Sequence, residues 1–227
     1  MKCTRPLAIA LGLIFSGQMA SAQDMTRYRG YALDSSVDAV IAASGARSAD
    51  VKTLHERPAK IQELQWRAPY ARFGDPLADP VRDMTFTFCD GALYQVVVNY
   101  DRDRTEGLTS EDIVDAVSAA YGVPALTTAR TRASPPAEAF PDSVVLARWE
   151  TAGALLTLVR GSRNTEYQLM LSSKSASARA RNAIREADRL DAIDAPRRES
   201  EQRKKDAGDA SAARDKTRIV NKAAFRP

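Results

Sequence analysis

The sequence predicts an α+β protein in which two tandem units, each a helix followed by an antiparallel sheet, precede a long charged C-terminal helix. Segments in which apolar and polar residues alternate recur between residues 51 and 172, as in half-buried strands. The pattern VDAV-x-AA-x-G occurs at residues 37–45 and again at residues 114–122, which suggests a repeat. Beyond residue 174, charged residues and alanine replace the alternation, as in a solvated helix.

The changes in composition give four segments. Residues 1–22 form a targeting segment, and residues 23–104 form the first α+β unit. Residues 105–173 form the second unit, and residues 174–227 form a charged extension that is helical or partly disordered.

The first segment has the parts of an export signal. Lys2 and Arg5 give a positive start, and residues 7–15 form a short apolar run. The sequence Ala20-Ser21-Ala22 fits a cleavage site after Ala22. The run is shorter than the ~20 residues that span a bilayer, although an uncleaved anchor is the alternative. We therefore expect an exported protein, periplasmic or secreted.

Each unit is expected to begin with a helix that has its own start and stop. The first covers residues 37–45 and ends at a glycine. The second has Thr109 as its N-cap, Asp112 in its first turn and Gly122 at its end. One face of this second helix is apolar, and consists of Ile113, Ala116, Val117, Ala120 and Tyr121.

After its helix, each unit shows the same order of extended segments. In the first unit these are residues 51–57, then 61–67 with Trp66, then a hairpin at 82–100. In the second they are residues 126–132, 144–150 with Trp149, 154–160 and 167–172. The shared order predicts a tandem repeat of about 75–80 residues; the alternative is chance likeness between two alanine-rich helices. Short connections favour antiparallel pairing, with the helices on one face.

The hairpin at residues 82–100 turns at Asp90-Gly91. A two-residue loop there would place Phe86 opposite Gln95, on the wrong face, because a one-residue slip exchanges the faces of a strand. A three-residue loop places Phe86 opposite Tyr94 or Val96. We therefore expect a type I turn with Gly91 in the left-handed conformation of a bulge.

Residue types exclude several kinds of catalytic site. His55 is the only histidine, which excludes a multi-histidine metal site. We also expect no histidine-dependent catalytic triad. No Gly-rich phosphate loop or nucleophile elbow occurs. After removal of residues 1–22, Cys89 is the only cysteine, so it is either an unpaired structural thiol or a link between two copies. We assign no catalytic residue and expect no cofactor.

A calcium loop is the one metal site that the acidic residues suggest. Asp101, Asp103 and Asp112 fall at its first, third and twelfth positions. The sixth position, which needs glycine, is Glu106. We therefore expect a connector between the two units with local ion pairs, and predict no metal site.

Two irregular loops and the extension hold the candidate binding surfaces. The loops, residues 68–81 and 133–142, contain Tyr70, Phe73 and Phe140, and act as recognition loops or as plain connectors. The basic candidates of the extension are Arg197, Arg198, Lys204 and Lys205. Pro196 is expected to break or restart the helix before them.

The extension differs in charge from the rest of the chain. Residues 174–227 hold 15 Lys and Arg and 9 Asp and Glu, a net charge of +6. The whole chain carries +4, of which Lys2 and Arg5 supply +2, so residues 23–173 carry −4. A basic arm can bind an anionic surface such as lipid headgroups, fold back on the acidic body, or only solubilise the protein. No nucleic-acid partner is expected.

The arrangement resembles a known family. Repeated helix-then-sheet units, each with a Trp-bearing strand and a terminal hairpin, resemble the β-lactamase-inhibitor-protein-like fold, which the outer-membrane assembly lipoproteins of the SmpA/OmlA type share. The segment YDRDRTEGLTSED, followed by AAYG, looks like exported bacterial proteins of no assigned activity. This chain lacks the lipidated cysteine of the lipoproteins. The resemblance covers residues 28–173 and implies protein binding by a sheet face, with no cofactor.

These observations predict a non-catalytic, exported protein-binding or adaptor module of the cell envelope, with an envelope protein as partner. The alternative is a carboxylate-dependent hydrolase acting on cell-wall glycan, since paired carboxylates cleave glycosides.

Overall fold

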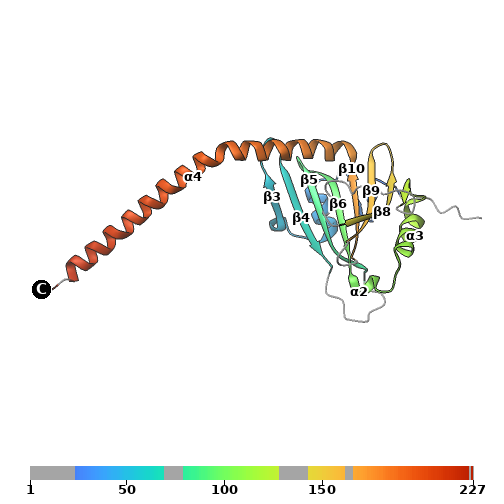
Figure 1. Ribbon diagram of the computed structural model, residues 1–227, viewed down its shortest axis with the longest axis horizontal. Coiled ribbons are helices and arrows are strands. Elements are labelled where there is room, and N and C mark those ends of the chain that lie inside the picture. The colour runs from blue at the N-terminus through green and yellow to red at the C-terminus, as the bar shows by residue number, and fades with distance from the viewer. Residues whose placement is uncertain (1–23, 69–78, 128–142, 162–165, 225, 227) are drawn as a thin grey trace, which may run out of the picture.

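The computed structural model describes residues 24–68, 79–127, 143–161, 166–224 and 226. They form an α+β fold with a long C-terminal helix, as the sequence predicts. Figure 1 shows a twisted sheet with helices on both sides, from which the last helix projects far beyond the strands.

All eight strands of the main sheet pair antiparallel, in the order β3-β4-β5-β6-β10-β9-β8-β7. Two four-stranded meanders therefore meet through their last strands, β6 and β10, where Val98 pairs with Leu169. A small hairpin of two further strands, β1 and β2, precedes the sheet. The strands are β1 (Arg27–Tyr28), β2 (Tyr31–Ala32), β3 (Val51–His55), β4 (Ile61–Arg67), β5 (Val81–Cys89), β6 (Ala92–Tyr100), β7 (Leu126–Thr127), β8 (Ser143–Glu150), β9 (Ala154–Gly161) and β10 (Tyr167–Ser173).

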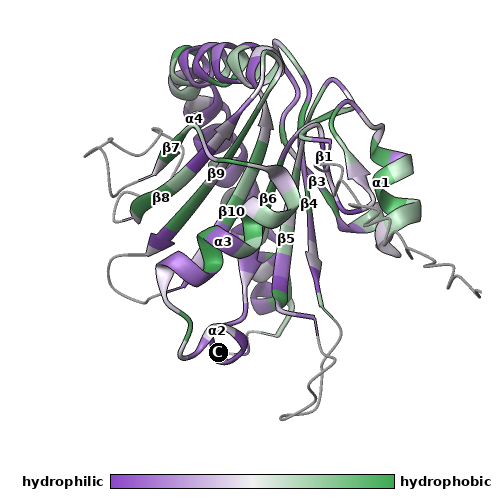
Figure 2. Cartoon of the chain, turned by 90° about the vertical axis from the view of Figure 1, so that its right-hand side faces the viewer, coloured by the Kyte–Doolittle hydropathy of each residue, from purple (hydrophilic) through white to green (hydrophobic). Residues whose placement is uncertain are grey.

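Helices cover the two sheet faces differently. α1 (Val37–Ser44) and α3 (Ser110–Tyr121) share one apolar core with the strands, and Figure 2 shows α3 lying in front of β6 and β10. The short helices η1 (Ser48–Asp50) and α2 (Arg102–Thr105) lie in connections. α4 (Lys174–Ala224) packs on the opposite face, where Ala176 and Ala180 meet Ile61 and Tyr94. Ile61 and Leu64 thus serve different cores, because an odd spacing along a strand separates the faces.

The caps of both early helices confirm the sequence predictions. The Thr109 Oγ1 accepts a hydrogen bond from the backbone N–H of Asp112 at 3.1 Å, and the Asp112 carboxylate accepts one from the N–H of Thr109 at 2.7 Å. These reciprocal bonds are a capping box. Gly45 and Gly122 end α1 and α3 at φ +70° and +86°, which glycine adopts without strain.

The loop of the β5–β6 hairpin is shorter than predicted. Cys89 pairs with Ala92, so the loop is Asp90-Gly91 alone, with both residues at positive φ. Phe86 still faces Val96, because a bulge between Thr87 and Phe88 corrects the register within the strands. The extra residue of the bulge, Tyr94, turns to the opposite face and packs under α4. The predicted three-residue loop was wrong, whereas the left-handed Gly91 is confirmed.

The sequence predictions for Pro196 and for the two tryptophans differ in part from the structure. Pro196 neither breaks nor restarts α4, which remains one helix from Lys174 to Ala224. The two tryptophans lie in β4 and β8 as expected, but Trp149 is buried and donates its indole N–H to the Gly122 carbonyl at 2.7 Å, whereas Trp66 is only partly buried. Of the strand expected at residues 126–132, only Leu126–Thr127 lies within the described residues.

Candidate functional site

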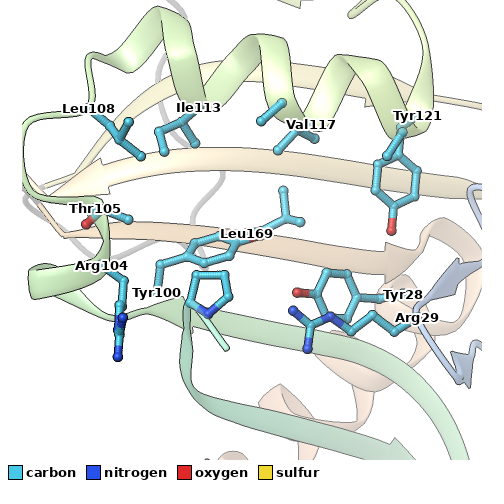
Figure 3. A pocket seen from close by; sticks show the side chains of 13 residues that line it. Tyr28, Arg29, Tyr100, Arg104, Thr105, Leu108, Ile113, Val117, Tyr121 and Leu169 are labelled. Atoms are coloured by element: carbon cyan, nitrogen blue, oxygen red, sulfur yellow. The ribbon is translucent and has the colours of Figure 1, made fainter. Parts of the chain in front are cut away.

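A pocket of about 370 Å³ lies between α3 and the sheet. Figure 3 shows the side chains of Ile113, Val117 and Tyr121 pointing from α3 toward Tyr100 and Leu169 on the strands below. The lining is mostly apolar and consists of Tyr28, Arg29, Pro80, Tyr100, Arg104, Thr105, Leu108, Ile113, Ala116, Val117, Ala120, Tyr121 and Leu169. This volume falls at the lower end of the ~300–1,000 Å³ that small-molecule sites occupy.

Three tyrosines contribute hydroxyl groups to the pocket. Tyr28 and Tyr100 both line the pocket, and the Tyr121 hydroxyl donates to the Arg27 carbonyl at 3.1 Å. Burial raises the pKa of Tyr28 and of Tyr100, and raises the pKa of Tyr121 to about 12. The phenols therefore stay neutral at physiological pH and act as hydrogen-bond donors and acceptors.

Arg29 brings positive charge to one end of the pocket. Its Nη1 and Nη2 contact the two Asp79 oxygens at 2.5 and 2.9 Å, and its guanidinium carbon lies 5.4 Å from the centre of the Tyr28 ring. The hydrogen bond from Arg29 lowers the pKa of Asp79. No Asp or Glu is among the residues that line this pocket.

A second pocket, of about 500 Å³, lies beside the start of α3. Its walls are more polar: Arg160 donates to the Ser110 hydroxyl at 3.1 Å, and the Tyr167 hydroxyl donates to the Leu108 carbonyl at 3.4 Å. Glu106 is the one carboxylate in its lining. Neither pocket thus offers the two carboxylates that glycoside cleavage needs.

Two of the three calcium candidates, Asp101 and Asp112, cap helices with their carboxylates. The Asp101 carboxylate accepts from the backbone N–H groups of Asp103 and Arg104, at 2.8 and 3.3 Å, at the start of α2. Asp112 belongs to the capping box of α3. Within the described part of the chain, no three metal-binding side chains form a group.

The sheet face that carries α4 is polar near β5, β6 and β10. Asn99 donates to the Asp83 carboxylate, and Gln168 donates to Asn99 at 2.6 Å, so a row of polar side chains crosses three strands. The amide groups of Asn99 and Gln168 donate within this row, whereas the Gln168 Oε1 is buried without a hydrogen-bond partner.

The first part of α4, residues 174–195, is anchored to the body and is called the docked part. Lys174 pairs with Glu150 at 2.5 Å where the helix starts. Near its end, Arg57 pairs with Asp194 at 2.5 Å and lies 3.8 Å from Asp191. Arg57 lowers the pKa of Asp194 by donating a hydrogen bond to it. Cys89 is a partly buried free thiol in the cluster beneath this part of the helix.

The second part of α4, residues 196–224, is called the arm. Every one of its residues is exposed, and Figure 1 shows it leading away from the sheet. Arg198 reaches back to Asp191 at 2.9 Å, and Arg197 lies 3.9 Å from Glu201 on the same helix. Lys204 and Lys205 are exposed further along the arm. The three loop candidates, Tyr70, Phe73 and Phe140, lie outside the described residues.

Comparison with protein families, with curated proteins and with solved structures finds no match to this chain. Within the described ranges, no helix has the length and apolar character needed to cross a bilayer.

Sequence reasoning identified one wall of the first pocket but not the pocket. The apolar face of α3 was predicted, with Ile113, Val117 and Tyr121 on it. The opposite wall comes from β1, β6 and β10, which no local pattern places beneath that helix. The tyrosines at residues 28 and 100, each at the end of a strand, were the available signal.

Proposed function

We propose that this protein is a non-catalytic, exported adaptor of the cell envelope that binds a partner protein through the arm. The observation that supports this most is the contrast within α4: the helix is anchored by residues 174–195, yet all of residues 196–224 are exposed. At 1.5 Å per residue the arm extends about 43 Å. A helix held at one end and exposed along the other is suited to reaching a partner.

The arm is stabilised as an isolated helix by pairs along its surface. Arg203 contacts Glu199 at 3.1 Å, and Gln202 donates to Asp206 at 2.7 Å. Such pairs, four residues apart, stabilise exposed helices by about 0.2–0.5 kcal/mol each. The arm therefore has local support for its helical form before any partner binds.

A stripe of small and uncharged residues lies on the second half of the arm, within residues 210–224. Its members, alternately three and four residues apart, are Ala210, Ala213, Thr217, Val220 and Ala224. This is the spacing at which one helix meets another in a coiled coil. We infer that the partner presents a helix to this stripe.

Charge and apolar content favour a protein over a lipid surface. The arm holds nine basic and five acidic residues, a net charge of +4, which favours an acidic partner. A helix that lies in a membrane interface needs a broad apolar face. The only large apolar side chains exposed on the arm are Ile219 and Val220. Anionic lipid headgroups are therefore the second candidate.

Export and the repeat belong to this proposal. The basic start, apolar run and small residues of residues 1–22 support export, with cleavage after Ala22. The mirrored order of the two meanders supports the view that the body consists of two units of common origin. The hydrolase alternative has less support, because the two pockets together bring only Glu106 to their walls.

The test compares two charge-adding variants of the full-length protein. Ala213→Glu with Val220→Glu places two carboxylates in the stripe. Ala212→Glu with Ile219→Glu adds the same charge, with the same seven-residue spacing, on another side of the helix. Each protein is cross-linked in intact cells, purified, and its bound proteins are quantified by mass spectrometry.

We expect a specific envelope protein to be recovered with the unchanged protein and the control, and lost with the stripe variant. Equal recovery with both variants contradicts the role of the stripe. If no protein is recovered above the level seen with a chain ending at residue 195, the adaptor proposal is wrong. Equal binding of the unchanged protein, the stripe variant and the control variant to vesicles containing anionic lipid would favour the membrane alternative.

A further inference from the structure

We propose that the pocket between α3 and the sheet binds a linear apolar molecule with one anionic end, of the fatty-acid type. This inference concerns the body of the protein and does not depend on the function proposed for the arm. It rests on the shape of the pocket, on the charges at its walls and on its hydrogen-bonding groups.

The pocket follows the length of α3. Ile113, Val117 and Tyr121 project into it from successive turns, and eight residues of helix rise about 12 Å. Leu169 and Tyr100 form the facing wall. A volume of about 370 Å³ spread over this length makes a narrow slot. A narrow apolar slot suits an extended chain better than a fused ring system, because a chain contacts both walls along its length.

The charge at the walls favours an anion. Arg29 and Arg104 both line the pocket, and no acidic side chain does. In Figure 3 the Arg29 guanidinium lies beside Tyr28 at one end, whereas Arg104 points away from α3. A cationic ligand would meet the Arg29 guanidinium at this end, whose Asp79 partner is already engaged and does not line the pocket.

Arg29 has donors to spare for a ligand. Asp79 accepts hydrogen bonds from its Nη1 and Nη2. A guanidinium carries five N–H groups, so this pairing leaves others for a carboxylate. The Asp79 pair also fixes the guanidinium in place, which reduces the entropy lost when an anion binds.

The tyrosines define where the anionic end lies. Tyr28 lies beside Arg29 and Tyr100 also lines the pocket, and burial raises the pKa values of both phenols, so they stay neutral donors. A carboxylate there can accept from Arg29 and from a phenol, while the chain runs beneath α3 toward Leu108. Hydrogen bonds to a charged group contribute about 1.5–3 kcal/mol, so the anionic end should add at least about tenfold in affinity.

Calorimetric titration of the full-length protein tests the ligand class with three probes of equal chain length: decanoate, 1-decanol and decyltrimethylammonium. We expect decanoate to bind at least about tenfold more tightly than 1-decanol. We expect no measurable binding of the ammonium compound. The proposal is overturned if decanoate fails to bind below about 1 mM, the affinity at which binding free energy is only about −4 kcal/mol. It is also overturned if the three probes bind equally.

Variants locate the binding. Val117→Phe fills the slot, and Ala120→Phe fills it from the partly exposed rim if the first variant does not fold; either should abolish decanoate binding. Arg29→Gln with Asp79→Asn removes the guanidinium without leaving an unpaired carboxylate. This double variant should reduce the affinity for decanoate about tenfold and leave the affinity for 1-decanol unchanged.

The matched control is Arg47→Gln with Asp50→Asn, which removes an exposed pair joined at 2.8 Å away from the pocket. It should leave decanoate affinity unchanged. Binding that survives the filling variants, or that falls equally in the control, places the ligand elsewhere and overturns the proposal.

Discussion

The docked part of α4 and the arm belong to one helix and have similar compositions, yet only the docked part is covered. In residues 174–195, the small side chains of Ala176, Ala180 and Ala187 are buried against the sheet. In residues 196–224, a similar series of small residues lies exposed. Both parts of α4 therefore present small side chains, but the sheet covers only those of the docked part.

The anchoring of the docked part depends on small residues and on end contacts. Alanine lets the helix approach the strands closely, so that Ala180 is fully buried beside Tyr94 and Ile61. Lys174 and Asp194 hold the two ends through Glu150 and Arg57. Exposed ion pairs contribute little singly, so the buried alanines carry most of the anchoring free energy.

The largest effect is expected from the same substitution on the two sides of this comparison. Ala180→Glu buries a carboxylate without a partner and should lower the free energy of unfolding by at least about 3 kcal/mol or release the docked part. Ala213→Glu should change it by no more than about 0.5 kcal/mol. Urea unfolding measures the first outcome, and the rate at which a thiol reagent modifies Cys89 measures release. Equal stability of the two variants would contradict the burial of Ala180 between the helix and the sheet.

Replacing Pro196 should stabilise the helix where the docked part meets the arm. Proline costs a helix interior about 3 kcal/mol relative to alanine, through a lost hydrogen bond and a clash with the preceding turn. Pro196→Ala should therefore slow amide hydrogen exchange in the first turns of the arm, by up to about 100-fold. Asp188 to Leu190 in the docked part should exchange at unchanged rates. Faster exchange in the arm would contradict the prediction.

Alkaline pH should act on the body and not on the arm, which contains no tyrosine. The folded pKa of Tyr121, about 12, lies above its usual value of 10. The unfolded chain therefore releases this proton first. The stability that the neutral phenol contributes is complete below pH 10 and is lost as the pH rises through about 12.

Tyrosinate absorbance should accordingly rise together with unfolding of the body. A protein that ends at residue 195 should give the same transition. In Tyr121→Phe the loss of stability over this pH range should be smaller, at the cost of about 1 kcal/mol at neutral pH for the lost hydrogen bond to the Arg27 carbonyl. A transition that moves when the arm is removed would show that the two parts are coupled.

The smallest effect is expected at the ion pair that closes the docked part. Arg57 lowers the pKa of Asp194 from its usual 3.8, so the pair stabilises docking above that pH and loses its effect as the pH falls through the lower, folded value. Asp194→Asn should speed hydrogen exchange near residue 194 at neutral pH, and the difference from the unchanged protein should vanish in acid. Asp206→Asn, in the arm, is the control and should have no effect on the docked part.

The hairpin shows how far sequence pattern reaches. Alternation around Asp90-Gly91 identified both strands and predicted that Phe86 lies opposite Tyr94 or Val96, of which the structure has Val96. It could not decide whether a third loop residue or a bulge would restore the register, because both place the same side chains on the core face. The bulge was selected by Tyr94, whose ring fills space under α4, a helix that starts 80 residues later.

The resemblance to the β-lactamase-inhibitor-protein-like fold stays a prediction, as does the repeat. The order of strands around β6 and β10 is compatible with two related units. The two tryptophans nevertheless differ, since Trp149 is enclosed by the core and bonded to Gly122 while Trp66 is partly exposed. Their strands, β4 and β8, are both second from an edge of the sheet, but only Trp149 bonds to the residue that ends α3.

By itself, the sequence determined the local elements of this protein: the helix capped at Thr109, the glycine stop of the first helix at Gly45, the alternating strands, the positive-φ turn at Gly91 and the charged C-terminal helix. These depend on hydrogen bonds and side-chain periods within a few residues of one another. Only the tertiary structure decided the bulge at Tyr94, the boundary between docked part and arm, and the pocket under α3. Those features arise where distant segments share a limited volume, and the fit of their side chains is not encoded in any one of them.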